Sequence, residues 1–153
     1  MSTRTFLGAI PAVLVAAGTI LAPHATAASF GNFDLIMPDR VDFHTWIWSM
    51  TGCLTNGVEA QPGCVVVTAI PQPVARAFNF QSTGHLVDGR FTMTVDDPFG
   101  LRCGNVYYGP TSPTHDVYSW DAVTLAGTLT SSFDAGCDGA PGTVAYPFSL
   151  ARL

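Results

Sequence analysis

The chain has 153 residues, with 6 Lys and Arg against 11 Asp and Glu, and a formal net charge of −5. Lysine is absent and the arginines are scattered singly, so the chain lacks the clustered positive charge that nucleic acids and anionic membrane surfaces require. We therefore expect neither a nucleic-acid partner nor polybasic binding to a membrane.

The first 27 residues have the pattern of an export signal. Arg4 supplies a positive n-region, Phe6–Leu21 is an apolar run, and Ala25-Thr26-Ala27 fits a small-residue cleavage site. The apolar run has about 16 residues, fewer than the roughly 20 that a membrane span needs. We expect cleavage before Ala28, which leaves residues 28–153 as one secreted or cell-envelope domain with no transmembrane segment.

The early strand candidates are short and alternate in polarity. Phe30–Met37 comes first, and Val41–Thr51 is the longest candidate. Both faces of this second segment are apolar, so we expect it to be buried on both sides. Cys64–Ile70 is rich in β-branched residues, and Val74–Phe80 alternates again.

The clearest hairpin is Gly84–Asp96, centred on Asp88-Gly89. Both central positions of a type I′ turn need positive φ, which Asp and Gly tolerate best. This turn sets Val87 opposite Arg90 and, counting outward, ends with Gly84 opposite Met93. One face of the ribbon then carries the apolar side chains of Leu86, Phe91, Met93 and Val95.

The second half of the chain continues the strand pattern. We expect Asp97–Gly100 to reverse the chain and Pro147 to mark an edge or interrupted strand. The remaining expected strands are Arg102–Tyr108, Asp116–Trp120, Leu125–Phe133 and Val144–Leu150, with a loop at Gly109–Thr114. No segment has a sustained helical period, and 11 prolines and 15 glycines interrupt the chain. The sequence thus predicts an all-β domain, a single antiparallel meander-type barrel or sandwich of about 8–10 short strands.

All four cysteines follow the expected cleavage site. An even number in an exported chain predicts two disulfides, for which three pairings exist. We favour Cys53–Cys64 and Cys103–Cys137, because the first pair brackets a turn-rich segment and would join two neighbouring strand ends. A zinc site is the rival interpretation, but the short spacing between zinc-binding cysteines is missing.

Several short motifs occur in a distinctive order. They are Trp46-x-Trp48 before Cys53 and Cys64, then His85–Met93, Tyr118–Asp121, Thr124–Thr128 and Phe148–Arg152. In this order they resemble a group of small exported mycobacterial proteins of unknown function. The resemblance implies a signal peptide and a β-rich domain, and it implies no activity.

No catalytic, metal or cofactor motif is recognisable. A Gly-x-Ser-x-Gly elbow is missing, and His115 and Asp116 are adjacent on a strand and so face opposite sides. The histidines lack metal-ligand spacing, and Asp96-Asp97 has the composition of a turn. We expect no catalytic residue, no metal and no cofactor. A hydrolase with an unrecognised site is the alternative, and a bond from His115 to Ser112 or Ser119 beside a pocket would favour it.

Aromatic residues give the best lead to a binding site. Trp46 and Trp48 share a strand face, whereas Tyr108, Tyr118 and Trp120 surround the expected Gly109–Thr114 loop. These side chains either fill the core or line a cavity or platform that binds a ligand. The sequence favours a non-catalytic domain that binds a ligand or a protein, with a purely structural envelope component as a further alternative. It leaves the partner and the oligomeric state open.

Overall fold

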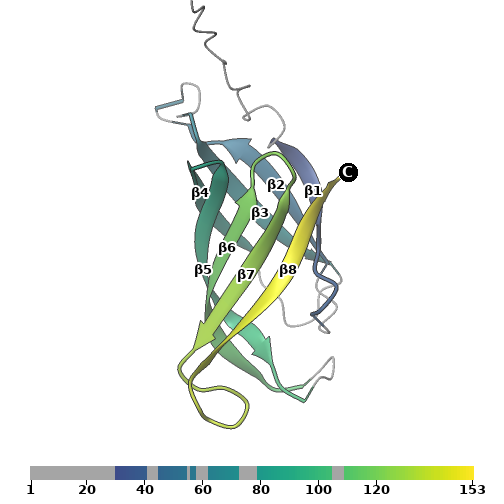
Figure 1. The fold of residues 1–153 in the computed structure, drawn as a ribbon, viewed down its shortest axis with the longest axis vertical. Helices are drawn as coiled ribbons and strands as arrows, with labels where there is room; N and C mark the ends of the chain where they lie inside the picture. Colours follow the sequence, from purple (N-terminus) through teal and green to yellow (C-terminus); the bar gives the residue numbers. More distant parts are fainter. Residues whose placement is uncertain (1–29, 41–44, 55, 58–61, 73–78, 105–108) are drawn as a thin grey trace, which may run out of the picture.

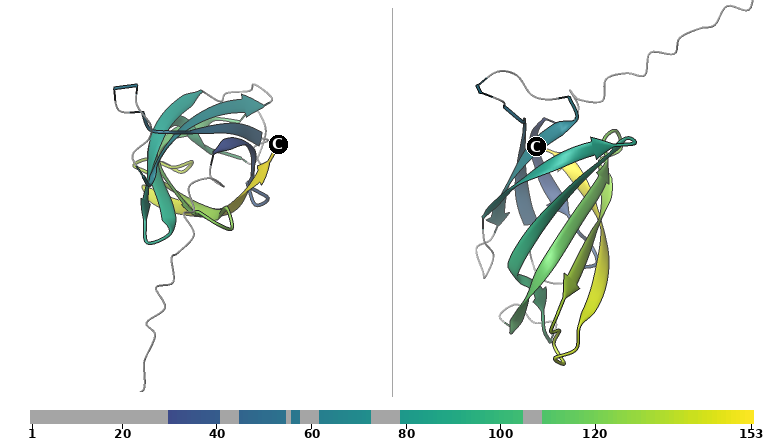
Figure 2. Two further views of the ribbon diagram at one scale, coloured as in Figure 1. Left: turned by 90° about the horizontal axis from the view of Figure 1, so that it is seen from above. Right: turned by 90° about the vertical axis from the view of Figure 1, so that its left-hand side faces the viewer.

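A computed structural model describes residues 30–40, 45–54, 56–57, 62–72, 79–104 and 109–153. These residues form antiparallel strands that pair in chain order and close into a barrel, as Figures 1 and 2 show. The all-β prediction is confirmed, and the sheet is a barrel rather than a sandwich. The strands are β1 (Gly31–Ile36), β2 (Thr45–Gly52), β3 (Cys64–Gln72), β4 (Phe80–Val87), β5 (Arg90–Arg102), β6 (Thr111–Asp121), β7 (Ala126–Phe133) and β8 (Gly142–Arg152).

The barrel has two ends that differ in their connections. The terminal end, at the top of Figure 1, is where β1 begins and β8 ends, and it carries the β2–β3, β4–β5 and β6–β7 connections. The distal end carries the other connections. Cys53–Cys64 bridges the β2–β3 hairpin at the terminal end, with 5.5 Å between Cα atoms. Cys103–Cys137 joins the exit of β5 to the β7–β8 connection at the distal end, with 5.3 Å between Cα atoms. Both predicted pairings are confirmed.

The predicted β4–β5 hairpin is present in the predicted register. Asp88 and Gly89 have φ of 51° and 79°, as a type I′ turn requires. Val87 pairs with Arg90, and the two preceding pairs of the prediction follow. Among the described residues the ladder ends after these three pairs, short of the expected pair of Gly84 with Met93. Beyond it, the Ser82 hydroxyl donates a hydrogen bond to the Thr94 carbonyl (2.8 Å).

The core fills the barrel with inward-facing aromatic and aliphatic side chains. Trp48 lies at its centre, with ring centroids 5.2 Å from Tyr118, 5.6 Å from Trp120 and 5.8 Å from Phe148. The expected burial of β2 on both sides is wrong, because Ile47 and Ser49 on its outer face are partly exposed. No other described element covers that face. The other fully buried large side chains are Phe33, Leu35, Met50, Val65, Val67, Phe91, Met93 and Leu129.

Two expectations for the second half of the chain are wrong. Asp97–Gly100 does not reverse the chain, because β5 continues through it with a shift of register. Such a bulge absorbs Pro98, which has no N–H to donate to the ladder. The expected loop Gly109–Thr114 is also partly strand, since β6 begins at Thr111. Most of the expected Val74–Phe80 and Arg102–Tyr108 strands lies outside the described residues.

Pro147 lies in a part of β8 that is paired on one side only. It pairs with Thr128 of β7, whereas β1 pairs with β8 only from Ser149 onward. The missing N–H of Pro147 therefore removes no bond to β1. The prediction of an edge applies to this residue, although β8 as a whole is paired on both sides.

Candidate functional site

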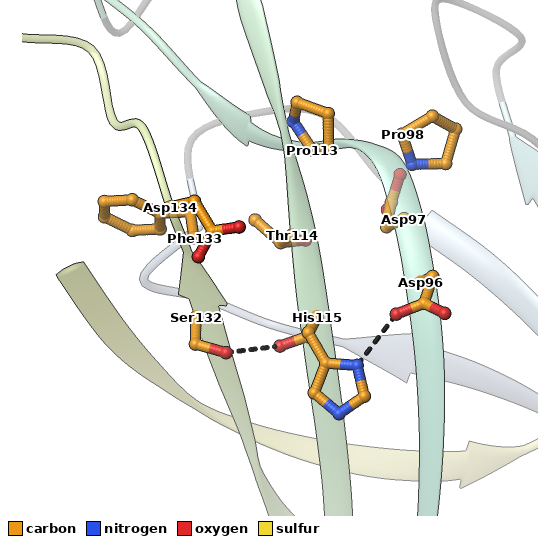
Figure 3. Close-up of a pocket in the computed structure, with 9 residues that line it drawn as sticks. All are labelled: Asp96, Asp97, Pro98, Pro113, Thr114, His115, Ser132, Phe133 and Asp134. Atoms are coloured by element: carbon orange, nitrogen blue, oxygen red, sulfur yellow. Dashed lines mark hydrogen bonds and ion pairs between the residues drawn. The ribbon is translucent and has the colours of Figure 1, made fainter. Parts of the chain in front are cut away.

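A depression of about 460 Å³ opens at the distal end, where β6 extends beyond its pairing with β7 (Figure 3). The β6–β7 ladder starts at His115 opposite Ser132, so the first residues of β6 pair only with β5. The bulge in β5 lies on the other side of this opening. We call the depression the distal pocket; it is lined by Asp96, Asp97, Pro98, Pro113, Thr114, His115, Ser132, Phe133 and Asp134.

Strand alternation divides the pocket into a buried floor and an exposed rim. Asp97 pairs with Thr114, and both side chains face inward and are buried. The next pair, Asp96 with His115, faces outward. The same two strands therefore place one carboxylate in the floor and another on the rim.

The rim is organised by His115. Its Nδ1 lies 2.8 Å from Asp96 Oδ1, and its backbone carbonyl accepts a hydrogen bond from the Ser132 hydroxyl (3.2 Å), as Figure 3 shows. The His115 and Asp96 side chains are 55% and 89% exposed, and such solvated pairs contribute less than about 1 kcal/mol. The pair therefore orients the imidazole more than it stabilises the fold.

The floor depends on a close approach of β5 to β6. Asp97 Oδ1 accepts the Phe99 N–H (2.7 Å), which closes the turn inside the bulge. A Cβ on Gly100 would coincide with the Thr114 hydroxyl, so only glycine permits this approach. Arg40, which follows β1, donates from Nη2 to the Gly100 carbonyl (2.7 Å) and fixes the bulge from the other side.

A buried carboxyl group, Asp116, lies on β6 behind the floor. It is fully buried between Val95 of β5 and Ser131 of β7, its paired neighbours. Burial raises the pKa of Asp116, and the Ser131 and Thr114 hydroxyls oppose this increase. Neither hydroxyl approaches with hydrogen-bond geometry, so both carboxylate oxygens and both hydroxyls have no partner among the described residues. Sequence analysis missed this group, although alternation along β6 places Asp116 on the same face as Tyr118 and Trp120.

The predicted aromatic residues lie in the interior as far as they are described. Trp48, Tyr118 and Trp120 are at most 1% exposed, and Trp48 contacts both of the others, so they form no exposed platform. The backbone of Trp46 pairs with Leu35 and Pro71, while its side chain and all of Tyr108 lie outside the described part of the chain. The distal pocket, in contrast, is open to solvent.

Among the described residues, the distal pocket brings a histidine to an acid but places no nucleophile in hydrogen-bond contact with the imidazole. The His115 ring contacts Asp96, whereas Ser132 bonds to the backbone of His115 and Ser119 accepts a hydrogen bond from Arg90 (3.2 Å). The bond to Ser112 or Ser119 that would favour a hydrolase is not formed. In the described part of the chain, no group of three His, Cys, Asp or Glu side chains is placed to hold a metal ion. No described helix is long and apolar enough to cross a membrane.

Comparison with known proteins adds no assignment. The chain matches no protein-family model, no curated protein and no solved structure. Its function therefore has to be argued from the distal pocket and the surface of the barrel.

Proposed function

We propose that the chain is an exported, non-catalytic binding barrel whose distal pocket takes a small cationic group. The observation that supports this is the convergence of three carboxylates, Asp96, Asp97 and Asp134, on one depression. Asp96 and Asp134 are exposed at the opening, so their carboxylates are accessible to a ligand.

Charge and shape favour an organic cation over an anion. The lining described around the pocket contains no Arg or Lys, and His115 is its one basic side chain. The chain as a whole is also acidic, so the field at the pocket attracts positive charge. Pro98, Pro113 and Phe133 supply apolar surface for the carbon part of a ligand. The pocket volume is within the range of about 300–1,000 Å³ that small-molecule sites occupy.

Export is part of the proposal. Two disulfides in a β-barrel are compatible with an extracellular or envelope location. The expected signal peptide and the resemblance to small exported mycobacterial proteins support the same location. Mass spectrometry of the exported protein should give an N-terminus at Ala28; an intact N-terminus would contradict this part of the proposal.

A titration with butylguanidinium, and with butylurea as the uncharged control, tests the site. We expect ¹⁵N chemical shifts to move at Asp96–Phe99, Thr114, His115 and Ser132–Asp134, and to move less at high salt. Asp96→Asn and Asp134→Asn should each weaken binding by about three- to fivefold, because each removes one nearby charge. Asp88→Asn is the matched control, since it makes the same charge change in the β4–β5 turn at the other end.

Three results would refute the cationic pocket. Shifts located elsewhere on the barrel would place the ligand outside it. Equal binding of butylurea, or unchanged binding by both pocket variants, would remove the electrostatic argument. Hydrolysis of an ester by the chain, lost in His115→Gln, would replace the proposal with the hydrolase alternative.

A further inference from the structure

Four exposed apolar side chains lie at or beside the terminal end of the barrel. Single exposed apolar residues are common on protein surfaces, but here each connection described at this end, and the C-terminus, carries one. They are the most exposed large apolar side chains of the described residues, whereas Ile36 and Ile70, at 45% and 43%, lie toward the other end. The four are Leu54 (71% exposed), Val87 (67%), Val123 (74%) and Leu153 (65%).

The backbone at or next to each of these residues is anchored locally. Leu54 follows the bridged Cys53, and Val87 precedes the type I′ turn. The Val123 N–H donates to Asp121 Oδ1 (2.9 Å), and the Leu153 N–H donates to the Asn32 carbonyl (3.0 Å). Binding through these residues would therefore order little additional chain, which lowers its entropic cost.

Beside these tips the described side chains are two acids and two arginines, and the Leu153 carboxylate and, by sequence, Glu59 of the β2–β3 connection add negative charge. Asp88 and Asp121 lie in the turns at this end, and Arg90 and Arg152 lie on the adjoining strand ends. The distal pocket, in contrast, gathers three carboxylates. The terminal end thus gathers no group of carboxylates like that of the distal pocket, which lowers its desolvation cost at a low-dielectric surface.

The N-terminal sequence indicates which surface this is. The apolar run Phe6–Leu21 is separated from the start of β1 by nine residues, 22–30, which reach at most about 30 Å when extended. Since β1 begins at the terminal end, this end faces the bilayer while the expected export signal is inserted in it. Cleavage would then release the barrel with this end nearest the membrane.

We propose that the terminal end docks on a lipid bilayer surface, with the tips of Leu54, Val87, Val123 and Leu153 inserted between headgroups. The contact is apolar rather than electrostatic, so it does not need the basic cluster that the chain lacks. It leaves the distal pocket turned toward solvent. The inference does not depend on what the distal pocket binds.

Flotation with phosphatidylcholine vesicles tests the docking. Residues 28–153 are the material to use, because the barrel and both disulfides lie within the described part of this processed chain. Leu54→Ser, Val87→Thr, Val123→Thr and Leu153→Ser should each lower partitioning by about three- to tenfold, the loss expected for one partly inserted aliphatic side chain. Ile36→Thr with Ile70→Thr is the matched control and should change partitioning less than about twofold, since these side chains are outside the contact. All six positions are exposed, so folding is retained.

A paramagnetic headgroup lipid gives a second readout that maps the contact. We expect signal broadening for amides of the β2–β3, β4–β5 and β6–β7 connections and the C-terminus, but not around the distal pocket. Absence of binding at millimolar lipid, equal loss of binding in the control pair, or release by moderate salt would overturn the proposal. Self-association through the same four residues without lipid would also overturn it, in favour of a second copy of the chain.

Discussion

Gly127 is the position where a single methyl group tests the packing of the barrel most directly. It lies on β7 between Trp120 of β6 and Phe148 of β8, its paired neighbours. A Cβ at this position would lie 2.5 Å from Phe148 Cζ and 2.6 Å from the Ser119 carbonyl oxygen. Both distances are far below a van der Waals contact. Gly127→Ala therefore requires the Phe148 ring to shift and β6 and β7 to move apart at Ser119.

The sign of the effect separates packing from backbone propensity. Without the clash, alanine in a strand would stabilise the fold by about 0.5–1 kcal/mol, since Gly127 does not have a positive φ. The phenyl ring of Phe148 can rotate or shift, but the Ser119 carbonyl belongs to the sheet and cannot move without disturbing the β6–β7 ladder. Overpacking of this kind costs about 1–3 kcal/mol. We therefore expect a net loss of about 1–2 kcal/mol in the free energy of unfolding.

Guanidinium unfolding followed by tryptophan fluorescence, with the disulfides intact, measures this loss as a lower midpoint at constant slope. Combining Gly127→Ala with Phe148→Leu should recover the part of the stability loss that comes from the clash with the ring. The part that comes from the clash with the Ser119 carbonyl should remain, and a double-mutant cycle detects this non-additivity. A Gly127→Ala variant as stable as the parent chain, or more stable, would refute the packing argument.

Two further predictions concern buried charge and covalent links. Burial raises the pKa of Asp116, so the folded chain binds more protons than the unfolded chain between pH 3.8 and the folded pKa, and stability falls as the pH rises through this window. The free energy of unfolding of Asp116→Asn, relative to that of the parent chain, should therefore increase by about 1–3 kcal/mol from pH 4 to pH 7. An equal difference at both pH values would contradict a raised pKa of this carboxyl group. Removal of Cys103–Cys137, which spans 34 residues, should cost about 3.8 kcal/mol against about 2.8 kcal/mol for Cys53–Cys64, which spans 11. Denaturation of the two double Cys→Ser variants checks this order, and a larger loss from the short loop would contradict it.

The sequence predicted best where local chemistry decides the structure. Asp88-Gly89 determines its own turn, and the turn then determines the register of the three pairs beside it. The Cys53–Cys64 bridge follows from the same reasoning, because a hairpin brings both of its ends together. Cys103–Cys137 has no such local signal, because it joins segments that meet only through tertiary structure.

The distal pocket depends on contacts that the sequence does not encode locally. Asp97-Pro98 has the composition of a chain reversal, but pairing with β6 on both sides of Pro98 keeps β5 in the sheet and converts the turn into a bulge. The pocket exists because β6 then extends beyond the start of its ladder with β7, which is a question of relative strand length. The location of Asp116, by contrast, could have been found from the alternation of β6.

The short ladder between β4 and β5 determines where the barrel opens locally. Eight pairs join β2 to β3, whereas the described β4 and β5 share three pairs and the bond from Ser82 to Thr94. Local opening is easiest where cross-strand bonds are fewest, so the amides of Thr94 and Asp96, which face β4 by alternation, should exchange faster than those of β2. Phe80 and Met93 lie beside the described part of β4 and β5 that has no ladder pairs, and they would be the first core side chains to become exposed to solvent. A solute that reaches the interior would then enter through the side wall of the barrel, without displacing the loops at either end.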